Sequence, residues 1–561
     1  MSDQTTETAG HPSAAQLLQQ GLFHHRRGEL AAAMDNYTKV LRNDPQNAEA
    51  LYYVAAVACQ EGQLDEGISL ARRALEHGPP EARVHNLIGK ALERKGDFLE
   101  AVKSFDAAIA LDADFAEAHG NRAAILADAG MPDQALAGFD RALALDPTAA
   151  ADWINRGALL QGLGRHEEAL ASYDKALALA PDDTTAQMNR ANALAALGRF
   201  AEAEAVCDGV IARAPAEPRA YARKGVAVMQ QGRFAEARDL LDQARRMNDQ
   251  DAEAAYGLAS LLLLSGEWRA GFPLFEARAH MPRPAYRPLD YNRWRGQPPG
   301  DYRLVLLSEQ DAADTVLFSR YAALLAARRH AVTLVSPPAL APLLRTLPGI
   351  EQVVTHPDEL RGGTDTRRIE WAPLLSTMGM LHLTPDTVPA QEPYLAVEPA
   401  RVARFTERLG GDGFKLGIAW RGTTRNDTAP LAALAPLAEI DGVRLISLQA
   451  GPAMQEAAQV PFGAKIERLL GAGDMSAESV LDTAALIAAC DAVVSVDCLP
   501  AHLAGALGKP VELALPHVAD WRWLMERADT PWYPAMRLYR QDAARDWAPV
   551  FARIAEALRR R

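Results

Sequence analysis

The sequence predicts a helical solenoid followed by an α/β region with two lobes. The first observation is a set of eight glycines that recur every 34 residues without a slip. A fixed period of this length indicates a helix-turn-helix unit copied end to end, in which each unit buries its apolar face on its neighbour. The second is a change of pattern beyond the last glycine, where short apolar runs alternate with helical segments. The glycines are Gly28, Gly62, Gly96, Gly130, Gly164, Gly198, Gly232 and Gly266.

Length and composition exclude several classes of function. At 561 residues the chain is too long for one hydrophobic core. With 59 Lys and Arg against 72 Asp and Glu, its net charge of −13 argues against nucleic acid as a partner, because phosphates need a positive face. The four cysteines have no metal-ligand spacing and no HExxH motif is present, so no metal is expected. Since the start of the sequence is polar and no apolar run could span a bilayer, we expect a soluble cytoplasmic protein without a membrane segment.

The repeats extend from 13 to 282, after a short N-terminal segment, 1–12, that is expected to be disordered. Each glycine fits the turn between two helices, where the backbone must bend sharply. A small residue follows five positions later, where the two helices cross closely, and most units have an aromatic or apolar residue four positions after that. The small residues are Ala33, Gly67, Ala101, Ala135, Ala169, Ala203 and Ala237. This pattern resembles tetratricopeptide repeats, of which about eight are expected.

A row of asparagines marks the expected concave face of the solenoid. Asn121, Asn155 and Asn189 are again 34 residues apart, on the first helix of their units. An amide side chain offers one acceptor and two donors, so such a row can hold an extended polypeptide by its backbone. The arrangement resembles the asparagine ladder of the eukaryotic O-GlcNAc transferase solenoid, which holds protein substrates. The alternative is that asparagine is simply common at this repeat position. The neighbouring arginines are interpreted as solvated surface charges.

The second half predicts two Rossmann-like lobes joined by a hinge. A segment rich in Pro, Gly and Trp, 283–300, is interpreted as a linker, and prolines from 384 to 399 separate a first lobe, 301–398, from a second, 399–561. Apolar runs predict strands and amphipathic segments predict helices. The expected strands are 304–308, 331–336, 351–355, 415–420, 444–449, 466–470, 492–497 and 511–515. The expected helices are 314–329, 339–346, 481–490 and 501–507.

Several motifs give this half a family resemblance. They are GIAWRG at 417–422, VVSVDCLPAHLAGALGKPV at 493–511, DWRWL at 520–524 and PWYP at 531–534. Together they resemble a glycosyltransferase of the GT-B fold, in the branch related to heptosyltransferases. The whole chain is similar to bacterial proteins that fuse tetratricopeptide repeats to such a domain, including soluble flagellin and protein glycosyltransferases. This resemblance implies an acceptor site on the first lobe and a nucleotide-sugar site on the second, with no other cofactor.

Donor-side candidates lie at strand ends and helix starts of the second lobe. Asp497 ends a strand at the place where open α/β sheets bind ligands, and His502 lies early in the following helix, where it could donate to a phosphate. A structural role is the alternative for His502, and helix capping is the alternative for Asp482 and Thr483. The donor-binding candidates are Arg421, Gly422, Gln449, Asp482, Thr483, Asp497, His502 and Gly505.

Asp314 is the candidate catalytic base, because transfer to a hydroxyl needs a proton acceptor. The family has a glycine-rich loop that ends in an aspartate after the first strand of the first lobe. Asp314 keeps the aspartate, whereas Asp311 and Ala313 stand where glycines are expected. A helix N-cap is the competing interpretation of Asp314. This sequence also departs from the family's pattern at Cys498 and at Thr428–Pro430.

These observations favour a protein glycosyltransferase that is independent of metals. Its solenoid would bind a polypeptide and its GT-B domain would transfer a sugar to Ser or Thr hydroxyls. From the resemblance, flagellin is a reasonable acceptor and a CMP-linked nonulosonic acid a reasonable donor. One alternative is a scaffold whose transferase domain has lost turnover, which the missing glycines favour. Another is transfer to lipopolysaccharide or another glycan, which has no need of an asparagine row.

Overall fold

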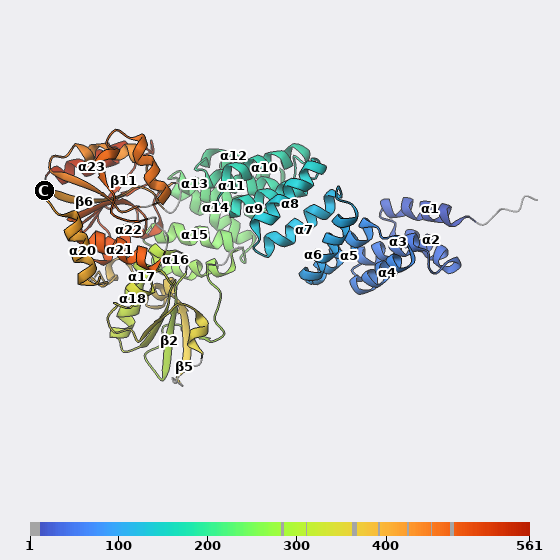
Figure 1. Cartoon of the computed structure of the whole chain (residues 1–561), viewed down its shortest axis with the longest axis horizontal. Helices are drawn as coiled ribbons and strands as arrows, with labels where there is room; N and C mark the ends of the chain where they lie inside the picture. Colours follow the sequence, from blue (N-terminus) through green and yellow to red (C-terminus); the bar gives the residue numbers. More distant parts are fainter. Residues whose placement is uncertain are drawn as a thin grey trace, which may run out of the picture. The chain divides into compact units, whose positions relative to one another are not determined.

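The structure is a computed structural model, which describes residues 12–281, 285–309, 311–361, 367–390, 393–422, 426–449, 451–471 and 476–560. The expected disordered segment therefore lies almost wholly outside the described residues. The chain divides into two compact units, with the division between Ala193 and Leu194. This point is well before residue 282, because the later repeats pack with the α/β region into one unit. Figure 1 shows the helices of the first half in blue to green and the strands of the second half in yellow-green to orange.

Within the described residues, sixteen helices form the repeats in consecutive antiparallel pairs, each pair being one 34-residue unit. The first eleven are α1 (Ala14–Arg26), α2 (Leu30–Asn43), α3 (Ala48–Gln60), α4 (Leu64–His77), α5 (Ala82–Lys95), α6 (Phe98–Leu111), α7 (Ala116–Asp128), α8 (Pro132–Leu145), α9 (Ala150–Gly162), α10 (His166–Leu179) and α11 (Thr184–Ala196). The others are α12 (Phe200–Arg213), α13 (Pro218–Gln230), α14 (Phe234–Met247), α15 (Ala252–Leu264) and α16 (Trp268–Phe275). Eight helix pairs confirm the expected number of repeats.

The 34-residue glycines occupy the turns between paired helices, as expected. All eight have φ between +74° and +86°, a backbone conformation that side chains disfavour. At Gly164, for example, φ is +74° and a Cβ atom would meet nothing within 4 Å. Backbone conformation, and not crowding, therefore explains the glycine at this turn.

The first sheet of the α/β region has five parallel strands in the order β1-β5-β2-β3-β4. They are β1 (Asn292–Arg293), β2 (Tyr302–Leu307), β3 (Ala331–Val335), β4 (Gln352–Val354) and β5 (Arg368–Pro373). The helices of this part are α17 (Ala312–Ala327), α18 (Ala341–Leu344) and α19 (Thr377–Met380). The expected linker thus contributes a strand, β1, whose register pairs Arg293 with Trp371. We did not predict β5, because its first residues are charged and give no apolar run.

The second sheet has six parallel strands in the order β11-β10-β9-β6-β7-β8. They are β6 (Phe414–Ala419), β7 (Val443–Ser447), β8 (Ile466–Glu467), β9 (Ala492–Val496), β10 (Val511–Leu515) and β11 (Met536–Arg540). The α-helices are α20 (Pro399–Leu409), α21 (Ala477–Ala489), α22 (Leu499–Ala506) and α23 (Ala548–Arg559). All expected strands exist within a few residues of their predicted bounds, whereas β11, α20 and α23 were not predicted.

Both sheets follow the doubly wound order, in which the strand order reverses between the first and fourth strands. That reversal falls between β2 and β5 in the first sheet and between β6 and β9 in the second. Ligands of open α/β sheets bind outside the carboxyl ends of the strands at such a switch point. The topology therefore identifies two crevices, and the helices that begin beside them, α17 and α22, pack against each other.

The last repeat is attached to the α/β region through aromatic side chains. Trp268 of α16 is buried and stacks on Trp532, with ring centroids 5.6 Å apart, and it meets Trp521 edge to face. Phe272 and Phe275 belong to the same hydrophobic core as the strands of both sheets. The end of the solenoid is therefore part of the framework that carries the two crevices.

Candidate active site

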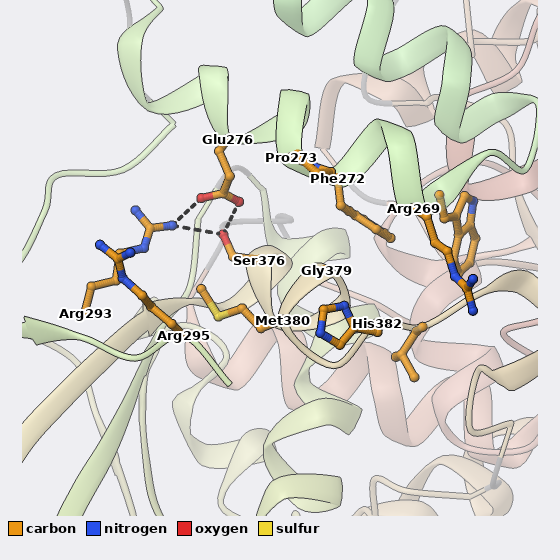
Figure 2. A pocket seen from close by; sticks show the side chains of 12 residues that line it. Arg269, Phe272, Pro273, Glu276, Arg293, Arg295, Ser376, Gly379, Met380 and His382 are labelled. Atoms are coloured by element: carbon orange, nitrogen blue, oxygen red, sulfur yellow. Dashed lines mark hydrogen bonds and ion pairs between the residues drawn. The ribbon is translucent and has the colours of Figure 1, made fainter. Parts of the chain in front are cut away.

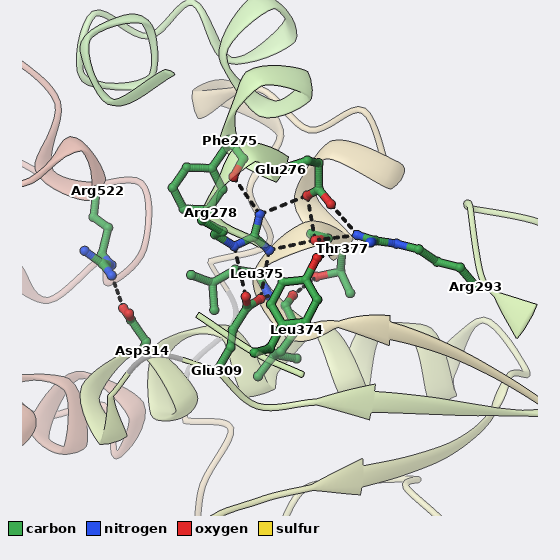
Figure 3. Close-up of polar contacts among 12 residues, drawn as sticks. Phe275, Glu276, Arg278, Arg293, Glu309, Asp314, Leu374, Leu375, Thr377 and Arg522 are labelled. Carbon is green, nitrogen blue, oxygen red and sulfur yellow. Dashed lines mark hydrogen bonds and ion pairs between the residues drawn. The ribbon is translucent and has the colours of Figure 1, made fainter. Parts of the chain in front are cut away.

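Asp314 of α17 and Arg522 of a 3-10 turn (Trp521–Trp523) form an ion pair that joins the two crevices (Figure 3). Asp314 lies in the first turn of α17, directly after β2, and its side chain is only 3% exposed. The N-cap of this helix is Asp311, whose carboxylate accepts a hydrogen bond of 2.8 Å from the backbone N–H of Asp314. Asp314 is thus not the capping residue, and its carboxylate is directed to Arg522.

Asp497 approaches the same place from the second sheet. It follows β9, and its carboxylate accepts hydrogen bonds from Trp523 Nε1 at 2.6 Å and from His502 Nε2 at 3.0 Å. The charge of Arg522 acts on Asp497 as well as on Asp314 and Asp520. Arg522 therefore lies among carboxylates from both sheets.

The environments of the two aspartates move their pKa values in opposite directions. Burial raises the pKa of Asp314 to about 8, although Arg522 opposes the shift. Burial also acts against the charge of Asp497, but hydrogen bonding and the charge of His502, followed by Arg522, hold its pKa below its ordinary value. Neighbouring acids with divergent pKa values are a mark of sites where one carboxyl exchanges a proton and the other remains charged.

His502 and Gly505 support this site from within the protein. His502 is 1% exposed, and its second ring nitrogen, Nδ1, lies 3.1 Å from the hydroxyl of Tyr533. Both ring nitrogens therefore have protein partners, which favours the structural alternative for this histidine. A Cβ atom on Gly505 would lie 2.5 Å from the ring of Tyr533, so this glycine makes room for the tyrosine.

Arg421, Gly422 and Gln449 meet at the carboxyl ends of β6 and β7. The Oε1 atom of Gln449 accepts hydrogen bonds of 2.9 Å from the backbone N–H groups of Trp420 and Arg421, and its Nε2 donates to the Arg421 carbonyl. Gln449 thus braces the loop after β6. The guanidinium of Arg421 pairs with Glu456 and is about half exposed, so it can be reached by a ligand.

Asp482 and Thr483 lie away from this site, on α21. Asp482 pairs with Arg401 and Arg404 of α20, and the Thr483 hydroxyl donates to the Ser479 carbonyl at 2.8 Å. The helix begins after the capping residue Ser476, so neither residue is the N-cap either. The contacts of Asp482 join α20 to α21, whereas that of Thr483 stays within α21, and the structure does not bring either residue together with the other donor-side candidates.

The asparagine row has unequal surroundings. Asn121 donates from Nδ2 to Asn86 Oδ1 at 3.1 Å, Asn155 is exposed and Asn189 is half-buried. Each neighbouring arginine pairs with an aspartate of the preceding helix, and these contacts are also periodic. The pairs are Arg122–Asp106 at 2.6 Å, Arg156–Asp140 at 2.7 Å and Arg190–Asp174 at 2.7 Å. The arginines thus link helices, and the 34-residue spacing of the aspartates was the signal that could have shown it.

A buried charge network beside the first crevice was not predicted. Arg278, just after α16, forms two hydrogen bonds of 2.9 Å with Glu309, at the carboxyl end of β2 (Figure 3). Their side chains are 2% and 0% exposed. Glu309 also accepts from the backbone N–H of Leu375, after β5. The network fixes the ends of β2 and β5 to the last repeat, and the only sequence signal was a glutamate following a buried strand.

Two further properties concern the part of the chain that the structure describes. No group of three or more His, Cys, Asp or Glu residues there could hold a metal ion. None of the helices in those ranges is long and apolar enough to cross a membrane.

Comparison with known proteins finds matches to a repeat family in the first half of the chain. Models described as tetratricopeptide repeat match residues 24–91, 86–150, 154–218 and 223–284. Protein FlbA of Caulobacter vibrioides is 29% identical over 340 residues, which are 54% of this chain and 54% of FlbA. The chain thus spans about half the length of this curated relative.

Two solved structures are similar to part of the chain. PilF of Pseudomonas aeruginosa is 20% identical, covering 37% of this chain and 94% of PilF with a TM-score of 0.35. TTC0263, a tetratricopeptide repeat protein of Thermus thermophilus, is 26% identical, covering 32% of this chain and 99% of TTC0263 with a TM-score of 0.29. The matched repeats and the sixteen helices described above together show a tetratricopeptide-repeat solenoid joined to two parallel α/β sheets.

Proposed function

We propose that the protein is a glycosyltransferase that modifies a polypeptide. Its solenoid binds the acceptor, and the two sheets hold the acceptor hydroxyl and the nucleotide-sugar at their adjoining crevices. The resemblance to flagellin glycosyltransferases makes Ser and Thr hydroxyls of flagellin the proposed acceptor and a CMP-linked nonulosonic acid the proposed donor.

The observation that carries this proposal is the convergence of Asp314 and Asp497 on Arg522. These residues come from the crevices of two separate doubly wound sheets, where ligands bind. A carboxyl with a pKa of about 8 suits a general base, because proton transfer is most efficient when the pKa is close to the working pH.

The proposed reaction is a direct displacement. The acceptor hydroxyl loses its proton to Asp314, and its oxygen forms a bond to the anomeric carbon of the sugar. The bond between that carbon and the phosphate oxygen breaks, and the nucleotide leaves with the electron pair. Arg522 and Arg421 are the cations available to the phosphate, whose negative charge increases as the bond breaks.

Arg522 then has two roles in sequence. Without a donor it pairs with Asp314 and covers the base. An anionic phosphate at the second crevice competes for the guanidinium, and Asp314 becomes available to the acceptor. Donor binding would in this way precede activation of the acceptor.

The solenoid supplies the polypeptide-binding part of the proposal. Its repeats match tetratricopeptide-repeat models, and the exposed amide of Asn155 with the half-buried amide of Asn189 can hydrogen-bond a peptide backbone. Asn121 can contribute one amide oxygen while its Nδ2 remains bonded to Asn86. Substituting all three asparagines by alanine is expected to weaken acceptor binding while donor binding is retained.

Thermal unfolding with CMP, UDP, GDP and ADP tests the donor site. A nucleotide at about 100 times its Kd stabilises a folded protein by about 2.7 kcal/mol. We expect a rise in Tm with one of the four that is lost in Arg421→Gln and retained in the matched control Arg408→Gln on α20. If none of the four changes the Tm of the wild type, the transferase proposal fails and a binding scaffold takes its place.

A further inference from the structure

A cavity of about 630 Å³ opens between the last repeat and the first sheet (Figure 2). Its walls come from α16, from β1 and the residues after it, and from α19 with the residues that follow. Ser376, in its wall, lies just after β5 and thus at the carboxyl end of a strand that borders the first switch point. The volume is in the range of about 300–1,000 Å³ found for cavities that bind drug-sized ligands.

The back of the cavity is electrically balanced. Glu276 accepts a hydrogen bond of 2.6 Å from the Ser376 hydroxyl and pairs with both Arg278 and Arg293. Arg278 is also paired with Glu309, so these two arginines are matched by two carboxylates. Burial acts against the charge of Glu276, but Arg278, Ser376 and Arg293 hold its pKa below the ordinary value. This part of the wall therefore has no charge to offer a ligand.

The rim, in contrast, has an excess of positive charge. Arg269 and Arg295 are exposed, and across the described ranges no carboxylate pairs with either of them. The nearby Glu267 is already paired with Arg238 at 2.8 Å. His382, which also lines the cavity, has no hydrogen bond from its ring to any residue in those ranges. On a chain with a net charge of −13, these two arginines without a carboxylate partner are a local exception.

The floor between these cations is apolar. It is formed by Phe272 and Met380 (Figure 2), and Leu383 also lines the cavity. Gly296 has φ of +95°, and a Cβ atom there would lie 2.8 Å from the Met380 carbonyl oxygen, so this glycine lets the loop after β1 approach α19. The close approach holds Arg295 beside the floor.

The spacing of the charges distinguishes between kinds of ligand. Figure 2 shows Arg295 and Arg269 at opposite ends of the cavity, with Phe272 and Met380 between them. One compact anion, such as a phosphate, reaches only one end and leaves the apolar floor uncovered. An elongated ligand with acidic groups at both ends and an apolar group between them matches all three parts.

We propose that this cavity binds a short acidic segment of a polypeptide, with carboxylates on Arg269 and Arg295 and an aliphatic side chain on Phe272 and Met380. That the polypeptide is the acceptor rests on the proposed transferase function; the binding itself does not. The cavity would then select acceptors by an acidic and aliphatic sequence near the modified hydroxyl.

Fluorescence anisotropy with synthetic peptides tests the proposal on the full chain. The probe is a labelled peptide with glutamates flanking leucines, and the two control peptides have glutamine for glutamate or glycine for leucine. Because two charged hydrogen bonds are lost, Arg269→Gln/Arg295→Gln is expected to weaken probe binding by about tenfold or more. The matched control is Arg328→Gln/Arg345→Gln, which removes two exposed arginines of the same region that do not line the cavity and is expected to bind as the wild type does.

A second variant and a second ligand complete the test. Met380→Trp fills the cavity without changing charge and is expected to weaken binding as well, with circular dichroism confirming the fold. Equal affinity of the double variant and the wild type, or equal binding of the probe and either control peptide, would overturn the proposal. Inorganic phosphate that displaces the probe at submillimolar concentration would identify a simple anion site instead. Nucleotide-induced stabilisation is measured on the same variants, so loss of the donor site and loss of this cavity are separate results.

Discussion

The solenoid and the α/β region use charged side chains in opposite ways. In the solenoid, an arginine pairs with an aspartate of the preceding helix in the same manner in successive repeats, and these pairs are partly exposed; in Arg190–Asp174 the two side chains are 26% and 52% exposed. The pair Arg522–Asp314 in the α/β region and the pair Arg278–Glu309, which joins the last repeat to the first sheet, are instead single and buried. Periodic exposed pairs require little desolvation and add little stability. Single buried pairs require a large desolvation, and a role in the proposed reaction would explain why the Arg522–Asp314 pair is present.

The largest effect is expected at the buried acid of the α/β region. Asp314→Asn removes the proposed base while it keeps the size of the side chain, so turnover should fall by about 10²–10⁴-fold. The measurement is the initial rate of nucleotide release from the donor in the presence of acceptor. Asp301→Asn, which changes an exposed aspartate just before β2, is the control. Wild-type rates in the Asp314 variant, with nucleotide binding intact, would remove this residue from the mechanism.

The two kinds of ion pair should differ in stability when one partner is removed. Arg278→Met leaves Glu309 buried and unpaired, at an expected cost of about 3–5 kcal/mol. Arg190→Met opens a partly exposed pair and should cost about 0–1 kcal/mol. Urea unfolding followed by tryptophan fluorescence measures the loss in Arg278→Met, because eight of the nine tryptophans lie from Trp268 to Trp547. Circular dichroism measures the unfolding of the solenoid in Arg190→Met. Similar losses of stability in the two variants would contradict the difference between buried and exposed pairs.

The pKa of Asp314 predicts how the rate and the stability depend on pH. If the reaction needs the ionised carboxylate, the rate at pH 6 should be roughly 50-fold lower than at pH 8, since its pKa is about 8. Folding stability should change with pH in the opposite direction to the rate. The folded state holds this proton from its ordinary pKa near 3.8 up to about 8, so stability should decline as pH rises through this range. Asp314→Asn should show a smaller decline, because Asp152 of the solenoid, whose pKa burial raises to about 6, still contributes to it. An equal pH dependence in the variant would refute the assignment.

The smallest difference in stability between the two regions is expected at two glycines that each face a tyrosine ring. A Cβ atom at Gly157 would lie 2.5 Å from Tyr173, and one at Gly505 would lie 2.5 Å from Tyr533. Overpacking costs about 1–3 kcal/mol, depending on how far the neighbour can shift. Tyr533 is held by His502 and by the cation of Arg320, whose centre lies 4.7 Å from its ring, so Gly505→Ala should fall at the upper end of this range. Gly157→Ala should fall at the lower end, and the reverse order of Tm values would contradict this view of the two regions.

The same contrast explains how much could be predicted from the sequence. The turn at Gly164 and the repeat number follow from a local rule that is applied eight times, and buried apolar runs indicate most strands. Strand β5 starts with charged residues, and the partners of Arg278 and Arg522 lie 31 and 208 residues away in the chain. No periodicity connects such residues. The sequence pattern put Asp314 and Asp497 near strand ends, but Arg522, whose charge acts on both, was only one letter of the DWRWL motif.

Hydrogen exchange with and without nucleotide tests the central claim most directly, namely that the crevice of the second sheet binds the donor. The nucleotide that gives the largest thermal shift should slow exchange of the backbone amides at 417–422 and 494–506, at the carboxyl ends of β6 and β9, and should leave the repeats before residue 194 unchanged. Absence of protection with all four nucleotides, or protection confined to the repeats, would contradict the account.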